Sequence, residues 1–342
     1  MTSKEIFHAA VEGKPAPRAP FWIMRQAGRY LPEYRALKEK RGFLEIVKTP
    51  ELALEASMQP VRRFDFDCAI IFSDILVVAE ALGFDYDFRP RGGIALERSI
   101  KDVNDIKNLP PAAAVREKLG YVKDALKMLR NELPDKAVLG FCASPFTLAA
   151  YMIEGGSSPD FRKFNDFFTN EPYLFEMLSA KLALAISEYA QMQLECGIDA
   201  LQMFDSHASC APFALYEDLS ARSANFALSK IQGRVKTIFF ANGMAGRFEE
   251  VKKVSADAYS LDSLSSLPEI AAQCGNSFAL QGNLQNSLLS DSTPEIVAQK
   301  TSELLNSMKP YRHILNLGHG ILPDAKLENV EALAGAAKNF RK

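Results

Sequence analysis

Two arginines four positions apart are the first candidates for chemistry in this sequence. Arg25 and Arg29 follow a short apolar run, and Gly28 between them lets the backbone approach a ligand closely or take a positive φ. Guanidinium groups bind carboxylates and phosphates through paired hydrogen bonds. Four more basic residues follow: Arg35, Lys38, Lys40 and Arg41. The pattern predicts a site for a small polyanion, although a solvated basic loop with weak surface ion pairs would have the same composition.

One carboxylate, Asp74, lies within an apolar stretch. The residues Ile70–Phe72 precede it and Ile75–Val78 follow it, with only Ser73 as a polar neighbour. A carboxylate in such surroundings is either paired with a cation or functional, because burying an isolated charge is costly. It could instead cap the next helix, a role that Ser73 could fill equally well. We predict that Asp74 is a functional acid.

Two histidines stand beside small residues. His207 and His319 could each be an acid, a base, a metal ligand or a hydrogen-bonded core residue. His207 and Cys210 form an H-x-x-C pair, which is a weak metal signal without a third ligand nearby, so we favour a role without metal. The glycines on both sides of His319 suit a side chain that reaches a cleft, but they could also only shape a turn.

Two common motifs are missing. Residues 155–158 (GGSS) lack the spacing of a phosphate-binding loop, and we interpret them as a flexible turn after Tyr151. Ser206 lacks the G-x-S-x-G pattern of a hydrolase nucleophile, so serine-hydrolase chemistry is not expected.

The polar residues described above follow short apolar runs that we interpret as strands. Each run is about five residues long and rich in β-branched and aromatic residues, which suits strands buried on both faces of a parallel sheet. The predicted strands are Pro20–Met24, Cys68–Phe72, Ala137–Phe141, Ala200–Phe204, Lys236–Phe240, Ala258–Leu261, Phe278–Gln281 and His313–Leu317. The predicted helices are Pro50–Phe64, Ala112–Leu133, Pro172–Glu195, Pro212–Ile231, Met244–Lys253, Leu264–Cys274, Pro294–Met308 and Lys326–Phe340.

The alternation of strands and helices favours a single (β/α)8 TIM barrel, an α/β fold, over an open doubly wound sheet. The active site of such a barrel lies at the C-terminal ends of the strands. A polar group follows every predicted strand here, which indicates a cleft lined from all sides. The segment 82–108 breaks the alternation and predicts an irregular insertion or a hairpin. Nothing else divides the chain, so we predict one domain over residues 1–342.

Composition excludes several classes of protein. The 342 residues are 48% hydrophobic and 24% charged, which is typical of a soluble globular protein. A net charge of −2 gives no general attraction to nucleic acid. No apolar run approaches the roughly 18 residues of a membrane span, and no signal peptide is evident. Five scattered cysteines predict reduced thiols in a cytoplasmic protein.

Taken together, several motifs resemble those of the uroporphyrinogen decarboxylase family. They occur in the same order from about residue 20 to about residue 325, and in combination they are specific. The matching segments are Met24–Arg35 (MRQAGRYLPEYR), Ile70–Val78 (IIFSDILVV), Tyr151–Gly156 (YMIEGG), Gln202–Ala208 (QMFDSHA), Leu280–Leu284 (LQGNL) and Asn316–Ile321 (NLGHGI).

The resemblance implies a (β/α)8 barrel, a homodimer and no metal or organic cofactor. It also implies the reaction, in which four acetate side chains of uroporphyrinogen become the methyl groups of coproporphyrinogen on the route to haem. By resemblance, the catalytic residues are Asp74, Arg25 and His319. The substrate-binding residues are Arg25, Gln26, Ala27, Gly28, Arg29, Asp74, Phe141, Tyr151, Phe204, Ser206 and His319. By the same resemblance, many relatives have a further arginine where this chain has Lys38. Lysine keeps the positive charge but cannot form the paired hydrogen bonds of a guanidinium group.

Two other functions stay open. A zinc-dependent corrinoid or thiol methyltransferase on the same barrel would need a His/Cys ligand set, for which the candidates are His207, Cys210, Cys274 and His319. A porphyrin or haem carrier would need an axial ligand and no proton donor. The sequence does not choose the proton donor of a decarboxylase among Arg25, His319, Tyr151 and a bound water.

Overall fold

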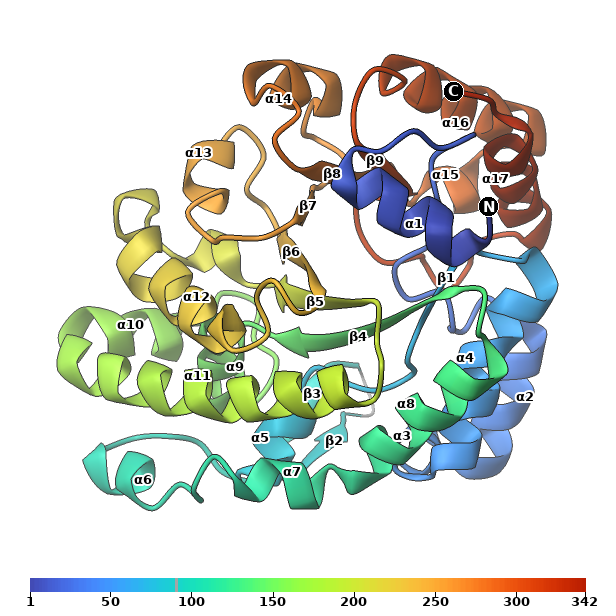
Figure 1. Cartoon of the computed structure of the whole chain (residues 1–342). Helices are drawn as coiled ribbons and strands as arrows, with labels where there is room; N and C mark the ends of the chain where they lie inside the picture. The colour runs from blue at the N-terminus through green and yellow to red at the C-terminus, as the bar shows by residue number, and fades with distance from the viewer. Residues whose placement is uncertain (90–91) are drawn as a thin grey trace.

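A parallel sheet of seven strands forms the centre of the structure, a computed structural model that describes residues 1–89 and 92–342. The strands follow the order β1-β4-β5-β6-β7-β8-β9, and every neighbouring pair is parallel. Their bounds are β1 Cys68–Ile70, β4 Ala137–Ala143, β5 Ala200–Asp205, β6 Lys236–Ala241, β7 Ala258–Ser260, β8 Ala279–Leu284 and β9 His313–Leu317. The sheet curls, and helices surround its outer face (Figure 1). The fold is therefore α/β, as predicted.

Helices α1 to α4 precede the first strand, α17 follows the last, and the other helices lie in the connections between strands. The bounds of the helices are α1 Ser3–Glu12, α2 Pro32–Arg41, α3 Phe43–Lys48, α4 Pro50–Phe64, α5 Val77–Ala81, α6 Val103–Lys107, α7 Ala114–Lys118, α8 Gly120–Glu132, α9 Pro145–Glu154, α10 Arg162–Asn170, α11 Pro172–Glu195, α12 Arg222–Ser229, α13 Phe248–Val251, α14 Leu267–Gln273, α15 Leu288–Asp291, α16 Pro294–Ser307 and α17 Leu327–Asn339. Short 3₁₀ turns η1 (Ala208–Cys210) and η2 (Phe213–Leu215) and the π-helical turn η3 (Glu217–Ala221) follow β5.

The predicted strand at residues 20–24 is reduced to a single parallel bridge between Phe21 and Leu315. Pro20 has no amide to donate, and two side chains take the amides that a ladder would use. Asp67 Oδ2 accepts from Phe21 N at 3.0 Å, and Asn316 Oδ1 accepts from Met24 N at 2.9 Å. The segment nevertheless lies between β9 and the start of β1, because Leu315 N donates to Pro20 O and Asp67 N donates to Phe21 O.

Side chains from three distant segments meet inside the curl of the sheet. Trp22 Nε1 donates to Gln281 Oε1 at 3.0 Å, and Gln281 Nε2 donates to Gln202 Oε1 at 3.0 Å. All three residues are buried. The chain of hydrogen bonds gives partners to the Trp22 indole and to both ends of the Gln281 amide, and it links residues near position 22 with β8 and β5.

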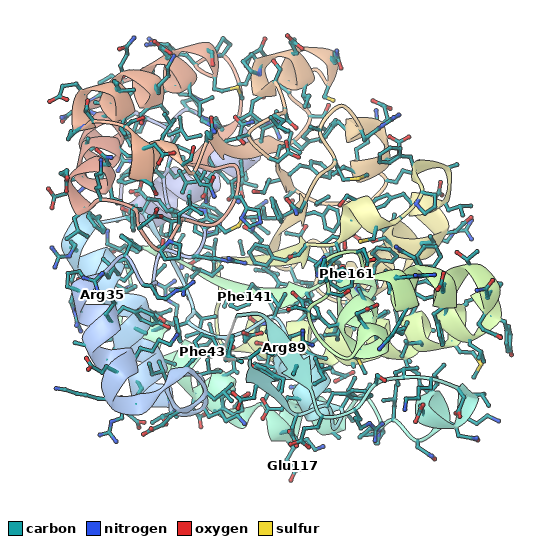
Figure 2. The ribbon with its side chains drawn as sticks, turned by 180° about the vertical axis from the view of Figure 1, so that it is seen from behind. Arg35, Phe43, Arg89, Glu117, Phe141 and Phe161 are labelled. Atoms are coloured by element: carbon teal, nitrogen blue, oxygen red, sulfur yellow. The ribbon has the colours of Figure 1, made fainter. Side chains whose placement is uncertain are left out.

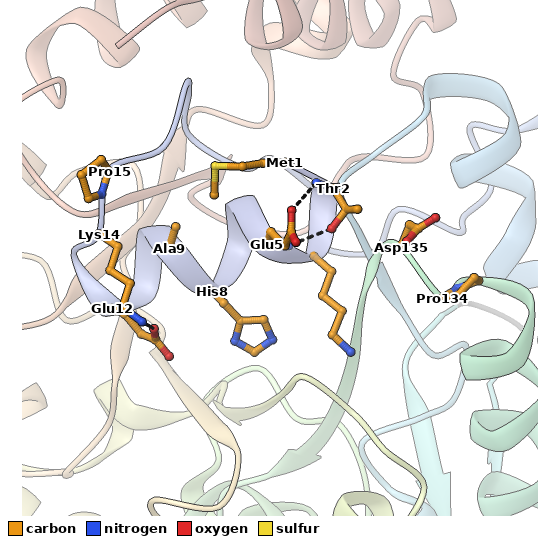
Figure 3. A pocket seen from close by; sticks show the side chains of 11 residues that line it. Met1, Thr2, Glu5, His8, Ala9, Glu12, Lys14, Pro15, Pro134 and Asp135 are labelled. Atoms are coloured by element: carbon orange, nitrogen blue, oxygen red, sulfur yellow. Dashed lines mark hydrogen bonds and ion pairs between the residues drawn. The ribbon is translucent and has the colours of Figure 1, made fainter.

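Helix α1 covers the amino ends of the strands (Figure 1). A capping box starts it, in which Glu5 N donates to Thr2 Oγ1 and Thr2 N donates to Glu5 Oε2 (Figure 3). A surface hollow of about 570 Å³ lies along this helix, next to Pro134 and Asp135. It is at the opposite end of the strands from the predicted site residues.

The segment predicted as an insertion contains a hairpin at the other end of the sheet. Strands β2 (Tyr86–Phe88) and β3 (Ile94–Leu96) pair in antiparallel fashion. The turn that follows Tyr151 pairs with the hairpin, since Ala95 and Gly156 form a bridge and Leu96 N donates to Gly155 O. The hairpin therefore lies against the end of α9.

Two predicted helices are broken in the structure, and two more are shorter, since 244–253 contains only α13 and 264–274 only α14. The stretch 212–231 contains η2, η3 and α12, and the stretch 112–133 divides into α7 and α8. In contrast, α4 and α11 have the predicted bounds. Across the residues that the structure describes, no helix combines the length and apolar character needed to cross a membrane.

Candidate active site

Asp74 lies in the loop that leaves β1, at the carboxyl end of the sheet. Its Oδ1 accepts from Leu76 N at 2.8 Å, which fixes the carboxyl group in the loop. Burial raises the pKa of Asp74 to about 6, and the Leu76 hydrogen bond and the charge of Arg25 oppose that shift. A carboxyl group with this pKa is mostly ionised at pH 7 but loses its charge in mild acid.

Arg25 is held in an unusual backbone conformation above the last glycine of the GHG segment. Its φ is 63°, in the left-handed region that non-glycine residues seldom adopt. A Cβ on Gly320 would lie 2.4 Å from Arg25 Cδ, so only glycine leaves room for the arginine stem. The charge of Arg25 acts on the pKa values of Asp74, Tyr151 and His319, so three other predicted site residues lie near its guanidinium.

Arg29 is exposed at the rim of the same loop. Arg35 supports the loop, because its Nη1 donates to Arg29 O at 2.8 Å and to Tyr30 O at 3.0 Å. Burial raises the pKa of Tyr34 to about 12, while the nearby charge of Arg29 opposes the shift. In the described ranges neither Arg25 nor Arg29 forms a salt bridge, which leaves both available for an anionic ligand.

The remaining residues of the first loop have different surroundings. Gln26 is fully buried, and its Nε2 donates to Cys68 O at 3.3 Å. Its carbonyl accepts from the Tyr30 hydroxyl at 2.8 Å. Ala27 and Gly28 are half-buried. Gln26 therefore anchors the loop from beneath, whereas Arg25 and Arg29 extend from its outer side.

An aromatic row crosses the carboxyl ends of three adjacent strands. Phe141 on β4 and Phe204 on β5 meet edge to face with centroids 5.8 Å apart, and Phe240 on β6 continues the row at 5.9 Å. The ring of His319 follows at 6.0 Å from Phe240. Figure 2 shows Phe141 near the middle of this face, with the labelled Phe43, Arg35, Arg89 and Phe161 around it. Phe141 and Phe204 keep a small exposed fraction of 7% and 9%, whereas Phe240 is buried at 1%, so the first two rings offer the apolar contact beside the charged groups.

Phe141 is fixed by a side chain that reaches between strands. Gln193 of α11 accepts from Phe141 N and donates to Phe141 O, each at 3.0 Å. A Cβ on the neighbouring Gly140 would lie 2.2 Å from Gln193 Oε1. Glycine at position 140 is therefore required for the contact between Gln193 and Phe141. This contact takes the place of backbone hydrogen bonds to β1, which ends before it can pair with Phe141.

Tyr151 and His207 form a second aromatic group beside Asp74. Their ring centroids are 5.0 Å apart, and the ring of Phe161 lies 4.1 Å from that of His207. Burial lowers the pKa of His207 to about 4, so the ring is neutral at pH 7. Burial, together with the charge of Asp74, raises the pKa of Tyr151. Ser206 precedes His207 directly after β5 and is half-buried.

His319 is also neutral at neutral pH. Burial and the positive charge of Arg25 lower its pKa, and Asp262 opposes the shift only in part. Lys38 lies in the last turn of α2 and is half-buried. These placements put a neutral imidazole next to Arg25.

Sequence reasoning missed two residues of this region. Phe240 completes the aromatic row, and its position at the end of a predicted strand, like that of Phe204, was an available signal. The second is Tyr86 of the hairpin, because burial and the negative charge of Asp74 both raise the pKa of its phenol. Only the docking of the hairpin brings Tyr86 there, so no local pattern indicates it.

The four candidate zinc ligands are not brought together. Cys274 lies at the end of α14 beside Lys252 and Glu249, whereas His319 lies beside Arg25 and Asp262. Within the described parts of the chain, no three His, Cys, Asp or Glu side chains gather as a metal site would require. The geometry gives no support to the methyltransferase ligand set.

The arrangement suits a ligand with flat apolar faces, N–H donors and several carboxylates. Asp74 can accept N–H groups, and Arg25 and Arg29 can bind carboxylates. Phe141 and Phe204 can contact a ring face. Neutral histidines add no charge to this surface. Binding such a ligand requires all of these side chains, because each of them contacts only one of its chemical groups.

Comparisons with known proteins agree with this chemistry. A family model described as "Uroporphyrinogen decarboxylase (URO-D)" matches residues 2–340. A uroporphyrinogen decarboxylase of Chloroflexus aggregans is 36% identical over 98% of this chain and 96% of its own length. One from Magnetococcus marinus is 37% identical over 99% of this chain and 97% of its own length. A solved methyltransferase from Methanosarcina mazei has a TM-score of 0.85 at 19% identity, covering 99% of both chains, and this likeness concerns the fold alone.

Proposed function

The chain belongs to the uroporphyrinogen decarboxylase family, and we propose that it converts uroporphyrinogen III to coproporphyrinogen III by removing four acetate carboxyl groups. Relatives with that name match nearly the whole chain. The observation that carries the proposal in the structure is the group of Asp74, Arg25, Tyr151 and His319, since one guanidinium acts on all three other side chains. The enzyme is then a carboxy-lyase of porphyrin and haem biosynthesis.

Decarboxylation of an acetate arm requires an acceptor for the electrons left by carbon dioxide. Many enzymes use a cofactor for this purpose. A pyrrole can accept the electrons itself once a ring carbon is protonated, because the ring becomes iminium-like. Loss of carbon dioxide then forms an exocyclic methylene. Protonation of the methylene carbon gives the methyl group, and loss of the proton first added to the ring carbon restores the pyrrole. We propose that no cofactor takes part.

Asp74 is the residue we assign to stabilising the cationic ring. A carboxylate fixed by the Leu76 amide at 2.8 Å needs little reorganisation when positive charge develops nearby. Bound pyrrole N–H groups would stabilise its ionised form and lower its pKa below the value of about 6 in the free enzyme. Because the four N–H groups of the macrocycle can share one carboxylate, the same site can serve four successive rings.

Arg25 and Arg29 are the residues we assign to substrate carboxylates, with Ala27 and Gly28 lining the same loop and Gln26 supporting it. Phe141 and Phe204 would contact the tetrapyrrole, and Tyr151 and Ser206 would contact its substituents. A proton donor must act close to the reacting ring carbon. Arg25, His319 and Tyr151 are the candidates, or a water that they hold. Neutral His319 carries a proton on only one ring nitrogen, so it could relay a proton but is not an imidazolium acid.

We also propose that residues 1–342 form one closed (β/α)8 barrel. The hydrogen bonds from Leu315 N to Pro20 O and from Asp67 N to Phe21 O support closure through the segment at residues 20–24. The internal contacts of Trp22, Gln281 and Gln202 support it as well. A single continuous cluster of buried hydrophobic residues is consistent with one domain.

We further propose a cytoplasmic homodimer. Leu264 after β7 is 86% exposed, and Phe213 and Leu215 after β5 are also exposed, so apolar groups lie at the carboxyl ends of the strands where a second copy could cover them. All five cysteines are free thiols, as expected in a reducing compartment. Light scattering during gel filtration should give twice the mass of the chain; a monomer would refute the dimer.

The experiment that tests the function is anaerobic incubation with uroporphyrinogen III. The products are oxidised to porphyrins and separated by their number of carboxyl groups. We expect a final product with four carboxylates and intermediates with seven, six and five. An unchanged octacarboxylate would refute the proposed function. Incubation with haem is the parallel control, since a haem carrier would shift the Soret band and leave uroporphyrinogen intact.

A further inference from the structure

The carboxylate of Asp205, at the end of β5, is fully buried and accepts hydrogen bonds from four hydroxyl groups. Its Oδ1 accepts from Ser144 Oγ and Thr147 Oγ1, each at 2.8 Å. Its Oδ2 accepts from Tyr216 OH at 3.0 Å and from Ser220 Oγ at 2.7 Å. Each carboxylate oxygen thus binds a different element, because the first pair starts α9 and the second pair belongs to the segment around η3.

Asp205 differs from the other buried aspartates at the ends of the sheet. Asp67 is paired with Arg18 at 2.5 Å, and Asp199 is paired with Arg130 at 2.6 Å, both at the amino ends of the strands. Over the described residues Asp205 forms no salt bridge. Burying a carboxylate without a paired cation lowers the stability of a fold, and residues that lower stability in this way are concentrated at functional sites.

The hydroxyl groups of this cluster connect two of the proposed substrate-contacting residues. Thr147 Oγ1 donates to Asp205 and also accepts from His207 N at 3.2 Å, so it fixes the peptide that joins Ser206 to His207. Thr147 lies one helical turn before Tyr151 on α9. Asp205 itself precedes Ser206 in the chain. Loss of the Thr147 hydroxyl would therefore move Ser206 and Tyr151 relative to each other.

We propose that Asp205 is a positioning residue which, through Thr147, holds Ser206 and Tyr151 in the mutual geometry that the substrate requires. The inference rests on the proposed decarboxylase function and adds a residue to it. Asp205 does not touch the substrate in this account. It acts by holding the loop after β5 against the first turn of α9, and small displacements of positioned groups are expensive for catalysis.

Two near-isosteric variants separate positioning from plain stability. Thr147→Val removes a hydroxyl on the α9 side of the carboxylate, and Tyr216→Phe removes one on the η3 side. We expect Thr147→Val to lower kcat/KM for uroporphyrinogen by on the order of tenfold or more. Tyr216→Phe should keep kcat/KM within about twofold, because Ser220 Oγ still donates to the same Asp205 oxygen and the bonds of Thr147 to Asp205 and to His207 N stay in place. Thr147→Ser restores the hydroxyl and should restore activity.

A double-mutant cycle with Tyr151→Phe tests the connection directly. In that background Thr147→Val should cost less than about threefold in kcat/KM, because the residue it positions has already lost its hydroxyl. If the losses multiply instead, or if Thr147→Val and Tyr216→Phe lose activity in proportion to their melting temperatures, the positioning role is refuted.

Amide hydrogen exchange gives a readout that does not depend on turnover. Thr147→Val should speed exchange of the His207 amide, and Tyr216→Phe should leave it unchanged. Equal exchange of this amide in wild type and Thr147→Val would overturn the inference even if activity falls. If the wild-type protein fails to consume uroporphyrinogen while the exchange result holds, the proposed function fails and the structural link between Thr147 and His207 stands.

Discussion

Replacement of Asp74 by asparagine is expected to make the protein more stable and much less active. Asparagine has nearly the same shape, and its Oδ1 can still accept from Leu76 N, which is 2.8 Å from the carboxylate oxygen. The variant therefore removes charge with little change in packing. It separates the electrostatic role of Asp74 from its place in the loop.

The expected gain in stability follows from the pKa of this carboxyl group. Burial raises the pKa from 3.8 to about 6. The folded state therefore binds the proton more tightly than the unfolded state, and stability falls as the pH rises through the window from about 4 to about 6. Two pKa units correspond to about 3 kcal/mol at 1.36 kcal/mol per unit, and partial exposure to water reduces this penalty to about 1–3 kcal/mol at pH 7.

Denaturation at two pH values measures this effect. An unfolding entropy of about 2.1 cal/mol/K per residue converts 1 kcal/mol into about 1.4 °C for a chain of 342 residues, so Tm at pH 7 should rise by about 1–4 °C. Below about pH 3, which is under both pKa values, the wild-type carboxyl group is protonated in both states and the difference should vanish; at pH 4 it should already be small. Asp124→Asn, on the exposed side of α8, is the control and should change Tm little at either pH.

Turnover of uroporphyrinogen provides the second readout. Kcat/KM of Asp74→Asn should fall by at least about tenfold, or 1.4 kcal/mol of barrier. The wild-type enzyme should lose kcat/KM as the pH is lowered through about 6, because Asp74 then loses its charge. A stability gain that is the same at pH 4 and pH 7 would refute the pKa argument. A variant that keeps more than a tenth of the activity would refute the role of the charge.

Three more predictions concern the groups around Asp74. Arg29→Gln should weaken the binding of octacarboxylate uroporphyrinogen by about tenfold, since a charged hydrogen bond contributes about 1.5–3 kcal/mol. It should weaken the binding of tetracarboxylate coproporphyrinogen less. Equal losses in a binding titration would count against a carboxylate contact. Gly320→Ala would place a Cβ 2.4 Å from Arg25 Cδ and should cut kcat/KM by about tenfold. The control Gly335→Ala, with open space at its Cβ position in α17, should keep activity and add about 0.5–1 kcal/mol of stability in urea unfolding. Normal kinetics for Gly320→Ala would mean that the position of Arg25 is unimportant. Activity should survive exhaustive dialysis against a chelator, and a loss that zinc restores would reverse the assignment of a cofactor-free reaction.

Local sequence patterns were sufficient for most of the secondary structure. The helix Pro172–Glu195 has the predicted bounds because a proline at its first position and a glycine shortly after its end mark both termini in the sequence. The strand His313–Leu317 also has the predicted bounds. Pattern failed at Pro20–Met24, where the amides of Phe21 and Met24 bind side chains that are distant in sequence.

The same division applies to the site. Residue type and chain position indicated Arg25 and Arg29 as parts of a basic loop and Asp74 as an acid among apolar neighbours, and these assignments stay predictions. Sequence could not distinguish Gln26 from its neighbours, although its side chain is buried beneath the loop. It also could not show that Arg35 binds loop carbonyls.

The sequence by itself determined which residue types are available: guanidinium groups for anions, an acid in an apolar stretch, and strands that direct them to one end of a sheet. The tertiary structure alone decided that the Asp205 carboxylate joins two elements, that Phe240 extends the aromatic row, and that Tyr86 lies near Asp74. Secondary structure depends on neighbours within a few positions, whereas burial, pKa and side-chain partners depend on residues that only packing brings together.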